Sequence, residues 1–307
     1  MISMKKRSRT DLFLILCGIL IWFLTDAARI RLWAAEALVL CGKSVIPALF
    51  PFLVVSSLLV SLGFGEWLSP YLAGLMAPLF RLPGLASSAL VLGLVGGYPV
   101  GAQTAADLYR QHLLTREEAE RLLTFCNNSN PVFLVSVLGV GVFGSVRTGV
   151  LLWLIHVLTA LLVGLFFRSH GKTADRRQPR SLPCRAVSLP VAFVAAVRSS
   201  ATGMLSVCAF VTLFYVLAAP LQALGGRLGP ALVGVVELFS LTPLLTPDLF
   251  GFVLAAGCVG WGGLSVLCQT AAVLDGTNLS LRPCLLGKLT QGLLSAVLAA
   301  LVWWYLL

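Results

Sequence analysis

The chain alternates long apolar runs with short polar interruptions, and one of these interruptions is repeated. Residues 96–124 interrupt an apolar run with glycines, a proline and amides, and residues 262–290 show the same pattern at one constant offset. Both stretches carry a Gly-Gly pair followed by a Gln-Thr-Ala-Ala block, which starts at Gln103 in the first and at Gln269 in the second. A polar break that recurs at corresponding positions of two hydrophobic halves indicates a transport site built by discontinuous helices.

The lengths of the apolar runs predict the fold class. Residues 33–64 and 146–167 are long enough to cross a bilayer, which takes about 20 apolar residues, and none of the runs shows the alternation of a membrane β-strand. Composition agrees, because 58% of the chain is hydrophobic and 11% is charged, whereas soluble domains are roughly one quarter charged. We therefore predict an all-α polytopic membrane protein with two internal repeats and broken or re-entrant helices.

Prolines, glycines and capping residues predict where the helices are interrupted. Residues 33–64 exceed one straight span and contain Pro47 and Pro51, each of which removes a backbone donor and favours a kink. Residues 85–95 would rise only about 16 Å as a helix before the Gly-Gly pair, roughly half a bilayer, which favours a re-entrant hairpin or a broken helix. Thr115 and Glu118 have the spacing of a capping box and predict a helix start.

The sequence pattern repeats after the one long polar segment, since residues 206–225 align without gaps on residues 44–63. This division predicts four parts. They are 1–31, a basic N-terminal tail with a first transmembrane helix; 32–167, repeat one; 168–188, a basic linker; and 189–307, repeat two. An odd number of crossings in each repeat would make the repeats inverted, an even number would make them parallel, and hydropathy leaves both open.

Basic residues cluster at two places in a chain of net charge +10. The first cluster comprises Lys5, Lys6, Arg7 and Arg9, and the second comprises Arg168, Lys172, Arg176, Arg177, Arg180 and Arg185. The positive-inside rule predicts that the N-terminus and the 168–188 linker are both cytoplasmic in a multi-pass protein of the cell membrane. No aromatic residues are interleaved with these clusters, so we expect the lipid bilayer, and no nucleic acid, as their partner.

Side chains at the two breaks are the candidates for solute binding. Glycines there permit unusual backbone angles at a site, or serve only for tight helix packing. Buried amides and hydroxyls need partners, so they face a solute, water or a neighbouring helix. The 127–131 block offers amides as ligands, although a water-exposed turn would use the same residues. The candidates are Gly97, Tyr98, Gln103, Thr104, Asn127, Asn128, Ser129, Gly262, Gly263, Gln269 and Thr270.

Four charged residues are candidates for pairing with an anionic solute or for ion or proton coupling. Arg116 and Arg282 occupy equivalent positions and would suit an anionic solute as charge partners; the alternative is interfacial anchoring or, for Arg116, an ion pair on its own helix. Asp107 and Glu237 are the most deeply placed carboxylates, which makes them candidates for ion or proton coupling.

No catalytic constellation and no metal-ligand spacing can be assembled from this sequence. The eight cysteines are scattered, without a Cys-x-x-Cys pair, and the three histidines lie far apart. We therefore expect no catalytic residues, no metal and no cofactor, and the sequence points to no particular protein partner.

Four motifs carry a resemblance to a known family. They are GLVGGYPVGAQTAADLY (93–109), LLTREEAERLLTFCNNSNPVF (113–133), GWGGLSVLCQTAAVL (260–274) and SVIPALFPFLVVSSLL (44–59). With these motifs the chain resembles the sporulation integral membrane proteins of the YlbJ family, which belong to a wider group that carries nucleoside-recognition or Gate domains. The resemblance extends over nearly all of the chain from about residue 38 onward. It implies Gate-like structure for both repeats.

The resemblance also implies a function. It predicts a permease that moves dipicolinic acid across a forespore-surrounding membrane during endospore formation. Dipicolinate is a small aromatic dianion, to which helix-break N–H groups and arginines could offer partners for carboxylates, and Tyr98 and Trp261 a surface for the ring. Residues 237–242 lack the glycine-containing Glu-x-Thr element expected in the family. A transporter of nucleoside-like solutes and a non-transporting sporulation scaffold are the alternatives.

Overall fold

The computed structural model describes residues 6–169 and 188–306, and every regular element in these two ranges is a helix. The predicted all-α class is therefore confirmed. The start of the basic tail, residues 1–5, and nearly all of the predicted linker lie outside the described residues.

Five described helical segments are long and apolar enough to cross a membrane. They are Ala27–Ser61, Val146–Ser169, Leu189–Ala223, Leu249–Leu274 and Arg282–Leu306. A further pair, Phe64–Phe80 and Gly84–Gly96, would make a sixth span but is bent by 96°, as a broken span or re-entrant loop would be. The multi-pass prediction and the prediction of interrupted helices both agree with this arrangement.

The first half of the chain contains most of the short helices. The main helices of this half are, in order, α1 (Lys6–Thr25), α2 (Ala27–Leu40), α3 (Ile46–Ser61), α4 (Phe64–Leu75), α5 (Ser87–Gly96), α6 (Val100–Arg110), α7 (Arg116–Leu123), a π-helical stretch (Phe133–Val142) and α8 (Val146–Phe166). The irregularity expected near Pro47 takes the form of a π-helical turn, Cys41–Val45, just ahead of α3. The predicted capping box at Thr115 and Glu118 is present at the start of α7.

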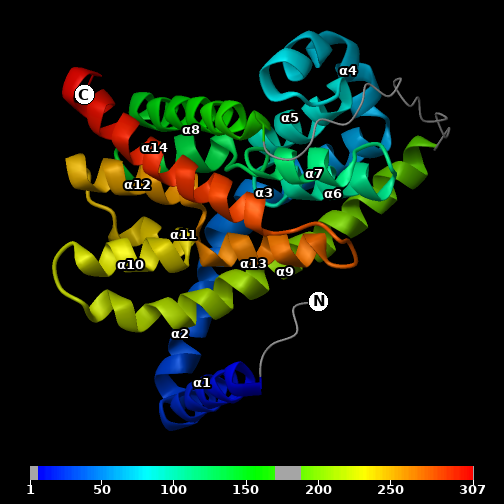
Figure 1. Cartoon of the computed structure of the whole chain (residues 1–307). Helices are drawn as coiled ribbons and strands as arrows, with labels where there is room; N and C mark the ends of the chain where they lie inside the picture. The colour runs from blue at the N-terminus through cyan, green and yellow to red at the C-terminus, as the bar shows by residue number, and fades with distance from the viewer. Residues whose placement is uncertain (1–5, 170–187, 307) are drawn as a thin grey trace.

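The second half contains α9 (Leu189–Ala218), α10 (Leu228–Val236), α11 (Leu238–Leu241), α12 (Leu249–Trp261), α13 (Gly263–Leu274) and α14 (Arg282–Leu306). The two halves are packed into each other (Figure 1): α9 contacts α2 and α3, α14 contacts α7 and α8, and α13 contacts α6. Helices α6 and α13 carry the two Gln-Thr-Ala-Ala blocks, so the fold places the repeated motifs in adjacent helices.

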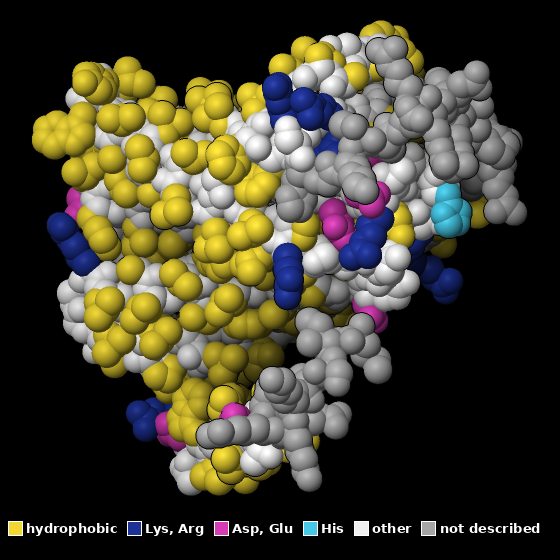
Figure 2. All heavy atoms as spheres, in the orientation of Figure 1, with side chains coloured by type: hydrophobic (Ala, Val, Ile, Leu, Met, Phe, Trp, Pro, Cys, Tyr) yellow, Lys and Arg dark blue, Asp and Glu magenta, His cyan; other side chains and the backbone are white. Residues whose placement is uncertain are grey.

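The outer surface of this bundle is apolar. Figure 2 shows hydrophobic side chains over much of the visible face, with smaller groups of charged side chains both at its margins and between them. Leu14, Leu205 and Leu293 are 67%, 72% and 71% exposed, respectively. Apolar exposure on this scale fits a surface that contacts lipid.

The closest helix packing surrounds the loop that follows α7. A Cβ atom at Gly93 or Gly101 would collide with the carbonyl group of Cys126, and one at Gly287 would collide with the carbonyl group of Thr124. Helices α5, α6 and α14 therefore approach the backbone of this loop directly, which only glycine permits.

We predict that Gly287→Ala will lower the free energy of unfolding by at least about 2 kcal/mol, because its new methyl group has backbone rather than a flexible side chain in its way. The matched control is Gly203→Ala in α9, where a Cβ meets no atom within 4 Å. That control should be neutral or stabilising by up to about 1 kcal/mol. Reversible unfolding in detergent measures both values, and equal stabilities of the two variants would contradict the packing described here.

Candidate functional site

Both predicted breaks are present, and the glycines at them adopt backbone conformations that other residues avoid. Gly97 has φ +84°, and Gly262 and Gly263 have φ +87° and +86°. A Cβ atom would lie 3.1 Å from the Asn130 Cβ if placed on Gly97, and 3.2 Å from the Val236 carbonyl oxygen if placed on Gly263. Unusual backbone angles and close packing, which the sequence offered as alternatives, therefore occur together.

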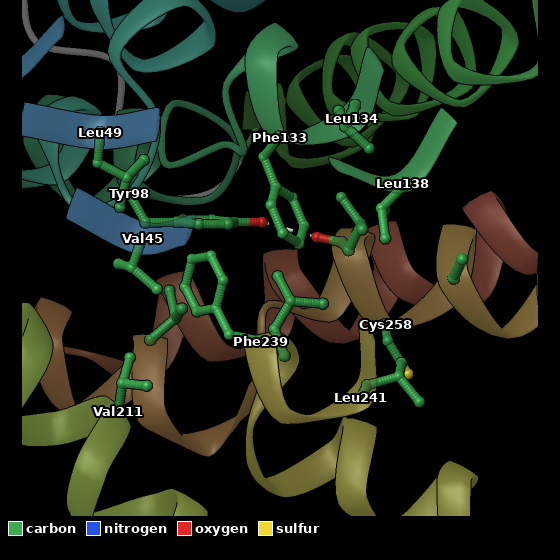
Figure 3. Packing of buried hydrophobic residues seen from close by; sticks show 14 of the residues in the cluster. Val45, Leu49, Tyr98, Phe133, Leu134, Leu138, Val211, Phe239, Leu241 and Cys258 are labelled. Carbon is green, nitrogen blue, oxygen red and sulfur yellow. Dashed lines mark hydrogen bonds between the residues drawn. The ribbon is translucent and has the colours of Figure 1, made fainter. Parts of the chain in front are cut away.

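Side chains close the helix ends that the breaks leave open. The hydroxyl of Tyr98 donates a hydrogen bond of 2.6 Å to the carbonyl oxygen of Val259, near the end of α12 (Figure 3). The indole N–H of Trp261 donates to the carbonyl oxygen of Val235, near the end of α10, at 2.9 Å. Irregular backbone at membrane depth is tolerated where protein groups pair with it or where it lines a cavity. Tyr98 thus links the first break to the second.

A small cavity lies where the two halves meet. Its volume is about 10 Å³, enough for about one water molecule. Four polar residues line it, together with five apolar ones: Tyr98, Ser129, Asn130 and Gln269, with Leu49, Phe133, Val207, Phe239 and Val266. Figure 3 shows the rings of Tyr98, Phe133 and Phe239 converging beside Leu49. Three of the predicted site residues, Tyr98, Ser129 and Gln269, are therefore brought together here.

A network of buried polar groups continues beyond Tyr98. Lys288 of α14 is only 1% exposed. Its Nζ donates to the Tyr98 hydroxyl at 3.3 Å, to the backbone carbonyl oxygen of Asn127 at 3.0 Å and to Gln291 Oε1 at 2.8 Å. All three acceptors are uncharged. The predicted site residues Tyr98 and Asn127 thus share a lysine that the sequence analysis did not select.

The amides of the 127–130 block form hydrogen bonds inside the protein, not at a water-exposed turn. Gln291 Nε2 donates to Asn128 Oδ1 at 3.1 Å, and the Ser129 backbone N–H donates to His156 Nε2 at 3.0 Å. Asn130 Nδ2 donates to the carbonyl oxygen of Ala48 at 3.1 Å. All four residues of the block are buried. The block is therefore hydrogen-bonded to three helices, α3, α8 and α14.

Lys288, Gln291 and His156 are absent from the predicted site residues because they lie in long apolar helices without a break. A usable signal was present: Lys288 and Gln291 are three residues apart, on one face of an otherwise apolar helix, and ionisable residues inside a span mark functional sites by default.

The two Gln-Thr-Ala-Ala blocks do different things although they occupy equivalent positions. Thr270 accepts a hydrogen bond of 2.9 Å from Asn127 Nδ2, which joins the two halves, whereas Thr104 is bonded only within its own helix, to Val100. Gln269 is buried, whereas Gln103 is exposed and bonded to Asp107. Of the two threonines, only Thr270 makes a hydrogen bond between the halves, to a loop residue rather than to a helix, and of the two glutamines only Gln269 lines the cavity.

The two candidate arginines lie on the surface. Arg116 is exposed and pairs with Glu120 at 2.8 Å, as its alternative role required. Glu120 also accepts the backbone N–H of Ser280 at 2.8 Å, which ties α7 to the turn before α14. Arg282 is exposed as well, and neither arginine is among the residues that line the cavity.

The two candidate carboxylates have different surroundings. Asp107 is partly exposed and pairs with Arg110 at 2.9 Å. Glu237 is fully buried at the N-terminus of α11, where Oε2 accepts hydrogen bonds from the N–H and the hydroxyl of Ser240. Its Oε1 has no hydrogen-bond partner within residues 6–169 and 188–306. A Cβ atom at Gly263 would lie 3.5 Å from the Glu237 Cα, so the backbone of Glu237 adjoins the second break.

Metal ligation finds no support in the geometry. The described part of the chain holds no group of three or more His, Cys, Asp or Glu side chains placed to bind a metal ion.

We predict that Thr270→Val will destabilise the protein by about 1–3 kcal/mol, because it leaves the buried Asn127 amide without its acceptor. Thr104→Val is the matched control: its hydroxyl is bonded only within its own helix, so its loss should cost about 0.5 kcal/mol or less. Unfolding curves of the two variants in one detergent give the comparison. Equal losses would show that the bond between Asn127 and Thr270 contributes nothing specific.

Comparison with known proteins places this chain. A family model named Gate, described as "Nucleoside recognition", matches residues 43–149, from the π-helical turn before α3 to the start of α8. Sporulation integral membrane protein YlbJ of Bacillus subtilis (strain 168) is 32% identical to this chain in an alignment that covers 84% of this chain and 74% of that protein. No solved structure matches the chain. The chain therefore belongs to the YlbJ family of sporulation integral membrane proteins.

Proposed function

We propose that this protein is a permease that moves a small solute through the buried polar site between its two halves. The observation that carries the proposal is that Tyr98, next to the first helix break, and Val266, one turn after the second, line one cavity whose lining comes from both halves. Discontinuous helices that meet between repeats are typical of transporter sites. Because the cavity has a volume of only about 10 Å³, the described conformation is the closed one, and transport requires the halves to move apart.

The solute that we propose is dipicolinate, moved during endospore formation. Membership in a sporulation family supports the setting. The chemistry of the cavity supports the solute, because Tyr98, Phe133 and Phe239 offer ring surfaces to an aromatic solute. Asn130 Nδ2 and Gln269 Nε2 each donate one N–H to a protein acceptor, Ala48 O and Ser265 Oγ, which leaves the second N–H of each amide group to donate to a carboxylate. The protein would then act in a forespore-surrounding membrane, with the N-terminus and the 168–188 segment on the cytoplasmic side.

A nucleoside-like solute is the second candidate, and the Gate match favours it. The same amides could pair with the edge of a base, and the same rings could stack on its face. The two solutes differ in charge, which makes them easy to separate by experiment.

We propose Glu237 as the coupling residue. It is a fully buried carboxylate with one oxygen free of hydrogen-bond partners among the described residues, and its backbone adjoins the Gly262-Gly263 break, which must move when the halves separate. Intramembrane carboxylates in such positions commonly carry the coupling proton or ion. Asp107, in contrast, is partly exposed and already paired.

The first test is uptake of labelled dipicolinate and of labelled uridine into liposomes that contain the purified protein. Gln269→Ala should reduce uptake of the true solute at least tenfold, because Gln269 lines the cavity. Gln111→Ala is the control, since Gln111 is exposed at the end of α6. A well-folded protein that carries neither solute would contradict the permease and favour the scaffold.

The second test addresses coupling. In liposomes with an imposed pH gradient, we expect wild-type uptake to follow the gradient and Glu237→Gln to respond to it at most weakly, while exchange of solute without a gradient continues. Glutamine retains an acceptor oxygen for Ser240, so the fold should persist. Glu66→Gln, at an exposed glutamate of α4, serves as the control. An unchanged gradient response in Glu237→Gln would remove this residue from the coupling mechanism.

A further inference from the structure

We infer that Lys288 is the charged group that makes the site select carboxylate anions over uncharged solutes of the same shape; this inference rests on the proposed permease function. Neither the family resemblance nor the repeated motifs single out this residue. The inference rests on three features of its surroundings.

The first feature is that the charge of Lys288 is not compensated. The ion pairs found within residues 6–169 and 188–306 join other residues, namely Arg29 with Asp26, Arg110 with Asp107 and Arg116 with Glu120. Lys288 is buried and has only neutral acceptors. When the amine is protonated, these acceptors satisfy its three N–H donors but provide no counter-charge inside the apolar bundle. An isolated buried charge is costly, and a bound anion would offset that cost.

The second feature is the connection to the cavity. Tyr98 lines the cavity, and its hydroxyl is one of the three acceptors of Lys288. Its ring centroid lies 5.0 Å from Lys288 Nζ. Tyr98 is thus the side chain shared by the cavity and the lysine, and a movement of its ring would bring the two together. Asn127 Oδ1, on a residue whose backbone carbonyl binds the lysine, has no hydrogen-bond partner in the described part of the chain.

The third feature is the comparison of the two halves. The constant offset that aligns the repeated breaks pairs Lys288 with Leu122 and Gln291 with Phe125. Leu122 and Phe125 are completely buried in an apolar cluster. Helix packing at this place therefore does not require a cation, since the first half uses leucine there. The lysine is a departure from the shared plan, as expected of a residue kept for a ligand.

These features define the class of ligand. A carboxylate oxygen can replace the Tyr98 hydroxyl or Gln291 Oε1 as an acceptor of the ammonium group, and it supplies the missing negative charge. A neutral amide of the same shape can replace the hydrogen bond but not the charge. The site should therefore distinguish dipicolinate from pyridine-2,6-dicarboxamide, which has the same ring and substituent positions but no charge.

The experiment compares these two compounds on wild-type protein and Lys288→Gln, by uptake into liposomes and by protection of the purified protein against thermal unfolding. We expect the wild type to prefer the dianion at least tenfold in both assays, and Lys288→Gln to lose this preference. Lys43→Gln, at an exposed lysine of the turn before α3, should keep it. Lys288→Gln should remain folded, because removing an uncompensated buried charge offsets part of the cost of losing the hydrogen bond to the Asn127 carbonyl oxygen.

The two assays separate the inference from the proposed function. If neither compound crosses the membrane but dipicolinate still protects the wild type and not Lys288→Gln, the permease fails while the anion site stands. A folded Lys288→Gln variant that keeps the wild-type preference overturns the inference. If both Lys288→Gln and Lys288→Met fail to fold, the lysine has a structural role and the inference is again overturned.

Discussion

The structure depends on one constraint, which is that backbone polar groups at a broken helix must be paired within the protein when lipid surrounds it. Tyr98 of the first half pairs with the Val259 carbonyl of the second, and Lys288 of the second half pairs with the Asn127 carbonyl of the first. Because each half supplies a side chain that pairs with a backbone carbonyl group of the other, the two breaks depend on each other. The same pairing brings the polar groups of both halves to one place.

The loop after α7 is the point at which this constraint is most severe. Its carbonyl groups at Thr124 and Cys126 are approached by glycines of three helices, and its amides are bonded to α3, α13 and α14. A loop this rich in asparagine would face water in a soluble protein. In this protein the loop is buried and both halves pack against it. Hydrogen bonds to its amides offset the cost of burying these polar side chains.

The two halves also differ in chemistry at matching positions of their sequences. The first half supplies Tyr98 and the asparagine loop, and the second supplies Gln269, Glu237 and Lys288. Equivalent positions hold Gln103, which is exposed, and Leu122, which is in an apolar cluster. The two halves therefore contribute different chemical groups to the buried polar region between them.

The sequence by itself determined the helical membrane class, the two glycine breaks, the capping box at Thr115 and the candidate status of Tyr98 and Gln269, because hydropathy, glycine spacing and capping act over a few neighbouring residues. Only the tertiary structure decided which members of each repeated pair are buried, since burial depends on helices more than 100 residues away, as in the bond between Asn127 and Thr270. It also revealed Lys288 and His156, whose surroundings in the chain are ordinary apolar helix. Their polar partners come from other helices, and no local pattern encodes such contacts.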